Sequence, residues 1–146
     1  MRIYLDNCCL QRPLDDQTHP RIRVETEAVF AILTAVQAGE IQLLGSEALD
    51  YEVSRIPDEG RRMEVSAVLA LATEYLEITD AVEAQALAFE QAGIYAMDAV
   101  HLAQASLANA DFFCTCDDKL FRKARQLPNL GCGVSTLLRL LPEVTK

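Results

Sequence analysis

The sequence lacks any long hydrophobic run, and it has no low-complexity tract, internal repeat or linker. A membrane-spanning helix needs about 20 consecutive apolar residues, and no segment approaches that length. The opening residues also lack the apolar stretch of a secretory signal peptide. We therefore expect a cytoplasmic protein without a membrane partner, folded as a single domain over residues 1–146.

Tryptophan is absent, and basic residues are scarce. The four tyrosines and five phenylalanines show no regular spacing, so no aromatic platform for stacked bases is indicated. Thirteen basic residues face 22 acidic ones, for a net charge of −9. This charge balance is unlike that of proteins that bind long nucleic-acid duplexes by contacting many phosphates. A local basic rim or bound cations still permit a nucleic-acid enzyme, and a basic protein partner would suit the acidic total.

The cysteine count is odd, with five cysteines, all in apolar surroundings: Cys8, Cys9, Cys114, Cys116 and Cys132. Free thiols in a reducing compartment fit this pattern better than a disulfide framework does. Cys114 and Cys116 face one side of an expected strand and suggest a metal pair with Cys8 or Cys9. Structural zinc sites, however, usually space their cysteines about two to four residues apart in loops, so no zinc site is predicted. A nucleophilic role for Cys8 is not favoured either, because no histidine is near in sequence.

Short apolar runs alternate with helical patterns along the chain. The expected strands span residues 3–5, 41–44, 112–116 and 131–135, and a short extended link covers 75–78. The expected helices span residues 21–38, 47–55, 59–72, 80–92, 97–105, 119–126 and 136–141. Strands that alternate with helices predict an α/β fold whose mainly parallel sheet is covered by helices on both faces.

Acidic residues follow two of the expected strands. Asp6 comes directly after strand 3–5 and is followed by the turn-prone Asn7, while Asp117 and Asp118 follow strand 112–116. The carboxyl ends of parallel strands meet at one edge of a sheet, where ligands bind. Taken alone, Asp6 is more simply a residue that ends a strand and starts a turn.

Two helices carry further acidic candidates. Ser46 is a good N-cap for helix 47–55, in which Glu52 lies about 60° around the axis from the apolar Leu49. Glu52 therefore borders the core, although a surface glutamate covering apolar atoms has the same pattern. Asp98 lies in the first turn of helix 97–105, where the helix dipole favours an anion and where a capping aspartate is equally common.

Four carboxylates in one crevice would repel one another and raise one another's pKa values. A divalent cation removes this cost. Ligation by oxygen alone, without histidine or cysteine, indicates Mg²⁺ or Mn²⁺ rather than zinc. Such ions lower the pKa of a bound water and stabilise the leaving oxygen of a phosphodiester, so we expect metal-dependent hydrolysis.

The chain resembles the PIN-domain nucleases over nearly its whole length. The resemblance rests on residues 3–7, on Ser46 with Glu52 six residues later, and on blocks 98–105 and 110–118. It implies a PIN-like three-layer α/β/α fold with a mainly parallel sheet and a Mg²⁺- or Mn²⁺-dependent ribonuclease site. The implied catalytic, metal-binding carboxylates are those of Asp6, Glu52, Asp98 and Asp117, with Asp118 as an auxiliary ligand. Many bacterial members of this size are toxins of toxin–antitoxin pairs, usually homodimers held inactive by a small antitoxin.

Two departures from the family pattern bear on activity. Asn7 directly follows Asp6, and Cys8 stands where the family commonly has asparagine. The segment around Asp117 and Asp118 is also one residue longer than the frequent pattern. These changes support an alternative, a catalytically degraded PIN-like module that binds nucleic acid or protein. A small phosphatase on a similar sheet is a third possibility.

The expected substrate contacts are Asn7, Thr115, Lys119 and Arg122. Lys119 and Arg122 follow the end of strand 112–116, so they are placed to hold RNA phosphates, although a solvated helix face explains them equally well. His101 lies one helical turn after Asp98 and is a candidate for touching substrate. Its apolar helix favours a packed core histidine instead.

Overall fold

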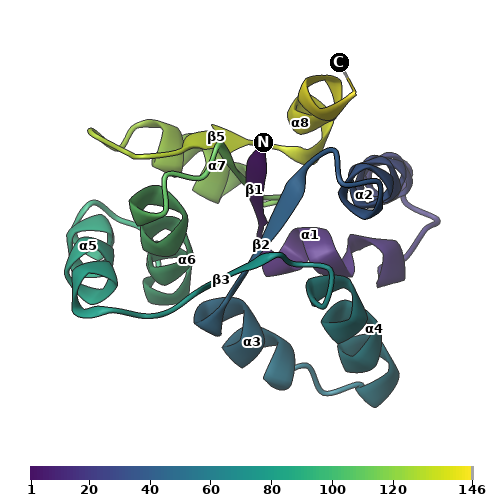
Figure 1. Cartoon of the computed structure of the whole chain (residues 1–146), viewed down its shortest axis with the longest axis horizontal. Helices are drawn as coiled ribbons and strands as arrows, with labels where there is room; N and C mark the ends of the chain where they lie inside the picture. The colour runs from purple at the N-terminus through teal and green to yellow at the C-terminus, as the bar shows by residue number, and fades with distance from the viewer. Residues whose placement is uncertain (146) are drawn as a thin grey trace.

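The computed structural model describes residues 1–145 and is built around a five-stranded parallel sheet in the order β3-β2-β1-β4-β5 (Figure 1). The strands are β1 (Arg2–Leu5), β2 (Gln42–Ser46), β3 (Glu74–Leu76), β4 (Phe112–Cys114) and β5 (Gly133–Ser135). The central strand β1 pairs with β2 on one side and β4 on the other. Its residues Ile3, Tyr4 and Leu5 are fully buried, as expected for a parallel sheet covered on both faces.

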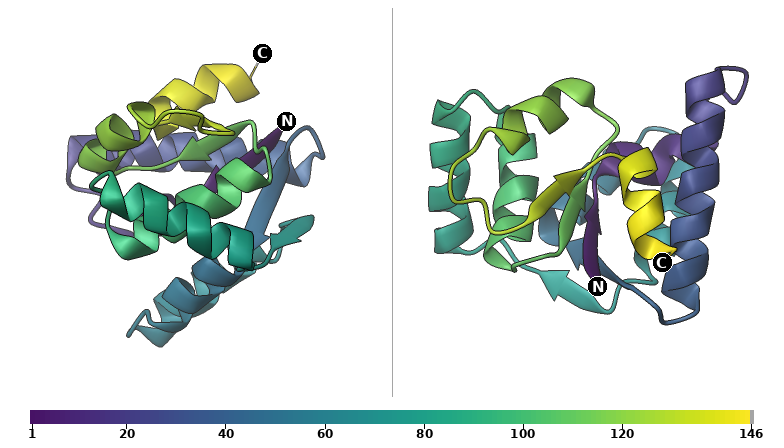
Figure 2. Two further views of the ribbon diagram at one scale, coloured as in Figure 1. Left: turned by 90° about the vertical axis from the view of Figure 1, so that its left-hand side faces the viewer. Right: turned by 90° about the horizontal axis from the view of Figure 1, so that it is seen from above.

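Helices form a layer on each face of the sheet. They are α1 (Asn7–Gln11), the 3₁₀ helix η1 (Arg12–Leu14), α2 (Pro20–Gln37), α3 (Glu47–Ser54), α4 (Glu59–Leu69), α5 (Asp80–Gln91), α6 (Ala96–Leu107), α7 (Asp118–Arg125) and α8 (Leu137–Val144). Helix α5 packs on α6, and α2 packs on α8. The right-hand view of Figure 2 shows these two pairs on opposite sides of the strands. The predicted three-layer α/β/α architecture is confirmed.

Local sequence signals explain where these helices begin and end. Ser46 caps α3, because its Oγ accepts a hydrogen bond from the Leu49 N–H at 3.0 Å. Gly39 and Gly93 follow α2 and α5 with φ angles of 76° and 102°, a left-handed conformation that glycine adopts without steric cost. No helix within residues 1–145 is long and apolar enough to cross a membrane.

Three local expectations need correction. Asn7 opens helix α1 instead of a turn, because Asp6 Oδ1 accepts the Asn7 N–H at 2.8 Å and caps the helix. The extended link 75–78 is a true strand, β3, which pairs in parallel with β2. Strand β4 stops at Cys114, two residues before the expected end of the strand.

The carboxyl ends of β1, β2 and β4 lie at one edge of the sheet, because the three neighbouring strands are parallel. Asp6 follows β1 directly. Helix α3, which carries Glu52, follows β2, and the segment from Thr115 to Asp117 follows β4. The fold therefore places three chain segments with acidic side chains at the same edge.

Candidate active site

Asp6 is the buried centre of this edge, with only 6% of its surface exposed. Its Oδ2 accepts hydrogen bonds from the Thr115 hydroxyl at 2.9 Å and from the Cys8 thiol at 3.4 Å. Burial raises the pKa of Asp6 well above its ordinary value, and the nearby Cys8 raises it further. An ionised Asp6 is therefore costly in this position unless a cation compensates its charge.

Glu52 approaches Asp6 together with a histidine. One ligand atom each of Asp6, Glu52 and His101 lie within 4.8 Å of one another. His101 Nε2 is hydrogen-bonded to Glu52 Oε1, and Nδ1 lies 2.5 Å from the Tyr4 hydroxyl. Both ring nitrogens are thus engaged, so His101 serves to orient Glu52 and is not available as a metal ligand.

The histidine contact continues into the protein interior. The Tyr4 hydroxyl lies 2.7 Å from Ser46 Oγ and 3.4 Å from Gln104 Oε1. The rings of Tyr4 and His101 meet edge to face, with centroids 5.6 Å apart. These contacts hold the Glu52 side chain in one orientation. The residues that make them come from β1, from the end of β2 and from α6. The expectation that His101 is a core residue is confirmed, because its side chain is fully buried.

Asp98 joins the cluster from the first turn of α6. The side chain is half-buried, and burial raises its pKa above the ordinary value. The carboxylates of Asp117 and Glu52 raise this pKa further, against the opposing effect of His101. Asp98 is therefore close enough to both carboxylates to feel their charge.

Asp117 lies at the start of α7, where its Oδ1 accepts the N–H groups of Lys119 at 2.9 Å and Leu120 at 3.1 Å. This cap uses one of its two oxygens. Asp98 and Asp117 line the same small surface depression. The structure thus brings Asp6 and Glu52 within 4.8 Å of each other, while Asp98 lies near enough to Glu52, Asp117 and Asp6 for their charges to interact.

Asp118 is oriented differently from these four acids. Its two oxygens each lie 2.8 Å from a nitrogen of the Arg21 guanidinium. This ion pair lowers the pKa of Asp118. The structure therefore places Asp118 in an exposed pair with α2, apart from the carboxylate cluster in which the sequence predicted it.

The expected substrate contacts fall into two groups. Lys119 and Arg122 are exposed on α7, next to Asp117. Thr115 is fully buried, donates to Asp6 and accepts the Asp117 N–H at 3.1 Å, so it positions the acids and is out of reach of a substrate. Asn7 is also buried, and its Oδ1 has no hydrogen-bond partner, the one such buried side-chain atom within residues 1–145.

Sequence reasoning missed an aromatic group beside the acids. Tyr95 is 70% exposed and lines the same depression as Asp98 and Asp117. The Nζ atoms of Lys119 and Lys123 lie 5.7 and 5.6 Å from the centre of its ring, within cation–π range. The sequence offered one signal for this group. Tyr95 lies three residues before Asp98, which puts both residues at the same end of α6.

The sequence matches the PIN domain family over residues 3–126. The chain therefore belongs to the PIN domain family, as the sequence motifs predicted. Its fold is similar to a chain in a solved structure described as "Crystal structure of VapBC2 from Rickettsia felis bound to a DNA fragment from their promoter". The TM-score is 0.61 at 19% identity, covering 92% of this chain and 98% of that one, so the likeness concerns the fold. Comparison with curated proteins gives no significant match.

The donor atoms of the site fit a hard divalent cation. They are carboxylate oxygens of Asp6 and Glu52, which lie with a ring nitrogen of His101 within 4.8 Å of one another. Asn7, which follows Asp6 in the chain, has a buried Oδ1 without a hydrogen-bond partner. Mg²⁺ and Mn²⁺ prefer such oxygen donors. Burial is the largest cause of the raised pKa values of Asp6 and Asp98, and neighbouring carboxylates add to it, so a bound cation would stabilise the ionised forms.

The protonation of this cluster gives a testable pH dependence. The pKa values of Asp6, Asp98 and His101 are all raised, so the folded chain binds protons more tightly than the unfolded chain. The stability that these protons contribute is lost as the pH rises through the folded pKa values. Cys116 contributes with the opposite sign over this range, because hydrogen bonds with Cys8 and Cys9 lower its pKa to about 5. We therefore expect the melting temperature of the metal-free Cys116→Ser variant to fall between about pH 5 and about pH 8.

Mn²⁺ should counteract this fall, because it binds the deprotonated carboxylates, and its stabilising effect should grow with pH. Thermal melts with and without Mn²⁺ across the pH range measure both effects. The pKa values of Asp16 and Asp118 are lowered, so their contribution to the stability of the folded chain is lost only below about pH 5. A Mn²⁺ effect of the same size at every pH would contradict the assignment of these carboxylates as metal ligands.

Proposed function

We propose that the chain is a divalent-metal-dependent endoribonuclease that hydrolyses RNA phosphodiester bonds. The observation that supports the proposal is the closeness of Asp6 to Glu52, together with the electrostatic influence of Glu52 and Asp117 on Asp98. Membership in the PIN domain family, whose members are typically nucleases, supports the same reaction class. We propose that these four carboxylates hold Mg²⁺ or Mn²⁺.

The proposed ion would activate a water molecule and stabilise the charge that develops on the phosphate. The protein residues hold its ligands in place. Thr115 and the Asn7 N–H fix the two oxygens of Asp6, and His101 fixes one oxygen of Glu52. Ligands oriented in this way need no rearrangement when a substrate arrives, which lowers the barrier to hydrolysis.

The surface beside the acids suits a single RNA strand. Lys119, Lys123 and the exposed Tyr95 border the depression that Asp98 and Asp117 line, and Arg122 is exposed on the same helix as the lysines. Lysines attract phosphates, and an exposed aromatic ring stacks on an unpaired base. The small basic group and the net charge of −9 argue against tight binding to a long duplex.

We also propose that the chain acts in the cytoplasm as the toxin of a toxin–antitoxin pair, as a homodimer with a small antitoxin protein as partner. The structural neighbour is described as VapBC2 bound to a promoter DNA fragment, and it shares this fold. The net charge of −9 suits a basic partner, and all five cysteines are free, as a reducing compartment requires.

An activity assay on the purified chain tests the enzymatic proposal. We expect single-stranded RNA to be cut internally with Mn²⁺ or Mg²⁺, and no cleavage after chelation of the metal. Duplex RNA and a phosphomonoester should be poor substrates.

The alternative is a degraded PIN-like binding module. Cys8 favours it, because its thiol contacts Asp6 where the family commonly has asparagine. Absence of both cleavage and thermal stabilisation by Mn²⁺ would favour this alternative.

A further inference from the structure

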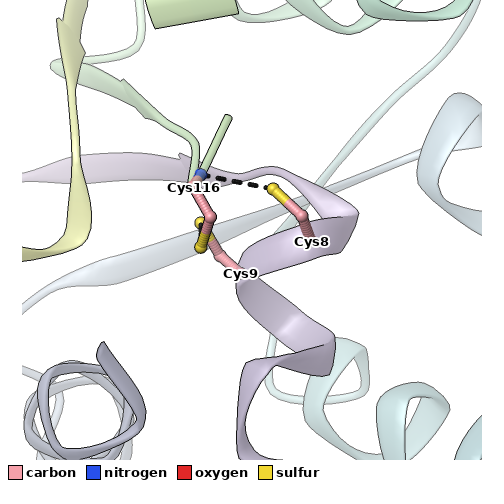
Figure 3. Close-up of side chains that lie close together, drawn as sticks. All are labelled: Cys8, Cys9 and Cys116. Carbon is pink, nitrogen blue, oxygen red and sulfur yellow. Dashed lines mark hydrogen bonds between the residues drawn. The ribbon is translucent and has the colours of Figure 1, made fainter. Parts of the chain in front are cut away.

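Three cysteine thiols meet beside the carboxylate cluster. Cys8 and Cys9 lie in α1, just after β1, and Cys116 lies just after β4 (Figure 3). Their sulfur atoms all lie within 4.8 Å of one another, and those of Cys9 and Cys116 are 3.6 Å apart. Cys132 is not part of this cluster. The arrangement is created by the pairing of β1 with β4, which joins residues 107 positions apart.

The spacing of the sulfurs is close to that of a metal–thiolate centre. Three sulfurs that each lie about 2.3 Å from one ion are about 4 Å from one another. The three sulfurs are already within 4.8 Å of one another, so small rotations about the side-chain bonds complete the triangle. The backbone of two adjacent strand ends holds the three thiols together before any ion arrives.

The pKa of Cys8 is raised chiefly by its hydrogen bond with Cys116, and that of Cys9 by burial, so both are protonated thiols until an ion binds. One backbone contact suits a bound thiolate. Cys8 Sγ accepts the Cys116 N–H at 3.2 Å, a contact shown in Figure 3, and hydrogen bonds of this kind stabilise charge on metal-bound sulfur. Cys9 and Cys116 are buried, whereas Cys8 is partly exposed. An ion can therefore enter past Cys8, and a water molecule can complete its coordination from that side.

Buried thiols often pack simply as small apolar side chains. In the cluster of three, by contrast, every sulfur makes a hydrogen bond, and Cys8 is partly exposed to solvent. We propose that Cys8, Cys9 and Cys116 bind one thiophilic d¹⁰ cation, Zn²⁺ or Cu⁺, with release of the thiol protons to solvent. Soft thiolate ligands select these ions over Mg²⁺ and Mn²⁺.

This proposal departs from the sequence analysis, which predicted no zinc site. That expectation rested on the spacing of cysteines within one loop, but the ligands here come from two strand ends. The site is also chemically distinct from the carboxylate cluster, although Cys8 Sγ lies 3.4 Å from Asp6 Oδ2. Binding therefore has to be measured directly and not through RNA cleavage.

Titration of the reduced protein with Cd²⁺ tests the proposal, because cadmium–thiolate bonds absorb in the near ultraviolet. We expect this absorption to saturate at one equivalent and to persist in excess Mg²⁺. Cys8→Ser and Cys116→Ser should each weaken binding at least tenfold. Cys132→Ser, which alters a cysteine outside the cluster, should bind as the parent does. Asp98→Asn should also keep the absorption, which separates this site from the carboxylates.

Displacement of Cd²⁺ by Zn²⁺, or anaerobically by Cu⁺ buffered with a chelator, identifies the preferred ion. Circular dichroism confirms the fold of each variant. If Cys116→Ser does not fold, the partly exposed Cys8→Ser variant decides the test. Absence of thiolate absorption, or equal absorption in Cys8→Ser and the parent, would overturn the proposal whether or not the protein cleaves RNA.

Discussion

Replacing Asp98 by asparagine is expected to reduce metal-dependent RNA cleavage by about 100-fold or more, while the fold stays intact. Asp98 is half-buried among other acids, and its pKa is raised by burial and by Asp117 and Glu52. Removing its charge relieves this repulsion. The Asp98→Asn variant should therefore melt at the same temperature as the parent or higher in the absence of metal, and gain less stability from Mn²⁺.

Cleavage rates and thermal melts on the same preparations measure both effects. Glu27→Gln is the matched control, because Glu27 is exposed on α2 and its replacement also removes one negative charge. The control should cleave RNA like the parent. An Asp98→Asn variant that retains parental activity would show that the carboxylate cluster is not the catalytic site.

Replacement of His101 by phenylalanine is expected to lower RNA cleavage by about 10- to 100-fold and to raise the Mn²⁺ concentration needed for half-maximal activity. Glu52 would lose the N–H group that orients its carboxylate, and Tyr4 would lose its partner at Nδ1. His101→Gln keeps a side-chain N–H donor, so it should recover part of the activity. A purely structural role would lower the amount of folded protein without changing the Mn²⁺ requirement.

The other histidine provides the control. His19 is exposed next to Asp16, and His19→Phe should leave the metal requirement unchanged. Metal titrations of the initial cleavage rate distinguish the variants. If His101→Phe is folded and shows the parental Mn²⁺ requirement, Glu52 is oriented by something other than His101.

The fold was predictable because short apolar runs and helical patterns alternate along the chain, which leaves a parallel sheet as the simplest solution. The position of Asp6 and Asp117 at one edge of the sheet followed from the same pattern, because they come after neighbouring parallel strands. Short elements were harder. Helix α1 depends on a single cap by Asp6, and β3 is a strand only because β2 lies next to it.

Contacts between distant segments could not be predicted from local patterns. Asp118 pairs with Arg21, 97 residues away, and the sequence around Asp118 does not predict this partner. Thr115 is drawn inward by its hydrogen bond to Asp6, 109 residues away. The thiol cluster likewise depends on the distance between two strand ends, which the spacing of cysteines along the chain does not reveal.

The two outermost strands of the sheet, β3 and β5, are only three residues long. Each therefore offers few unpaired backbone groups onto which a strand from another molecule can add. Self-association by intermolecular sheet extension, a route to aggregates and fibres, is accordingly disfavoured for this chain. Two copies that assemble into a dimer should meet through the surfaces of their helices.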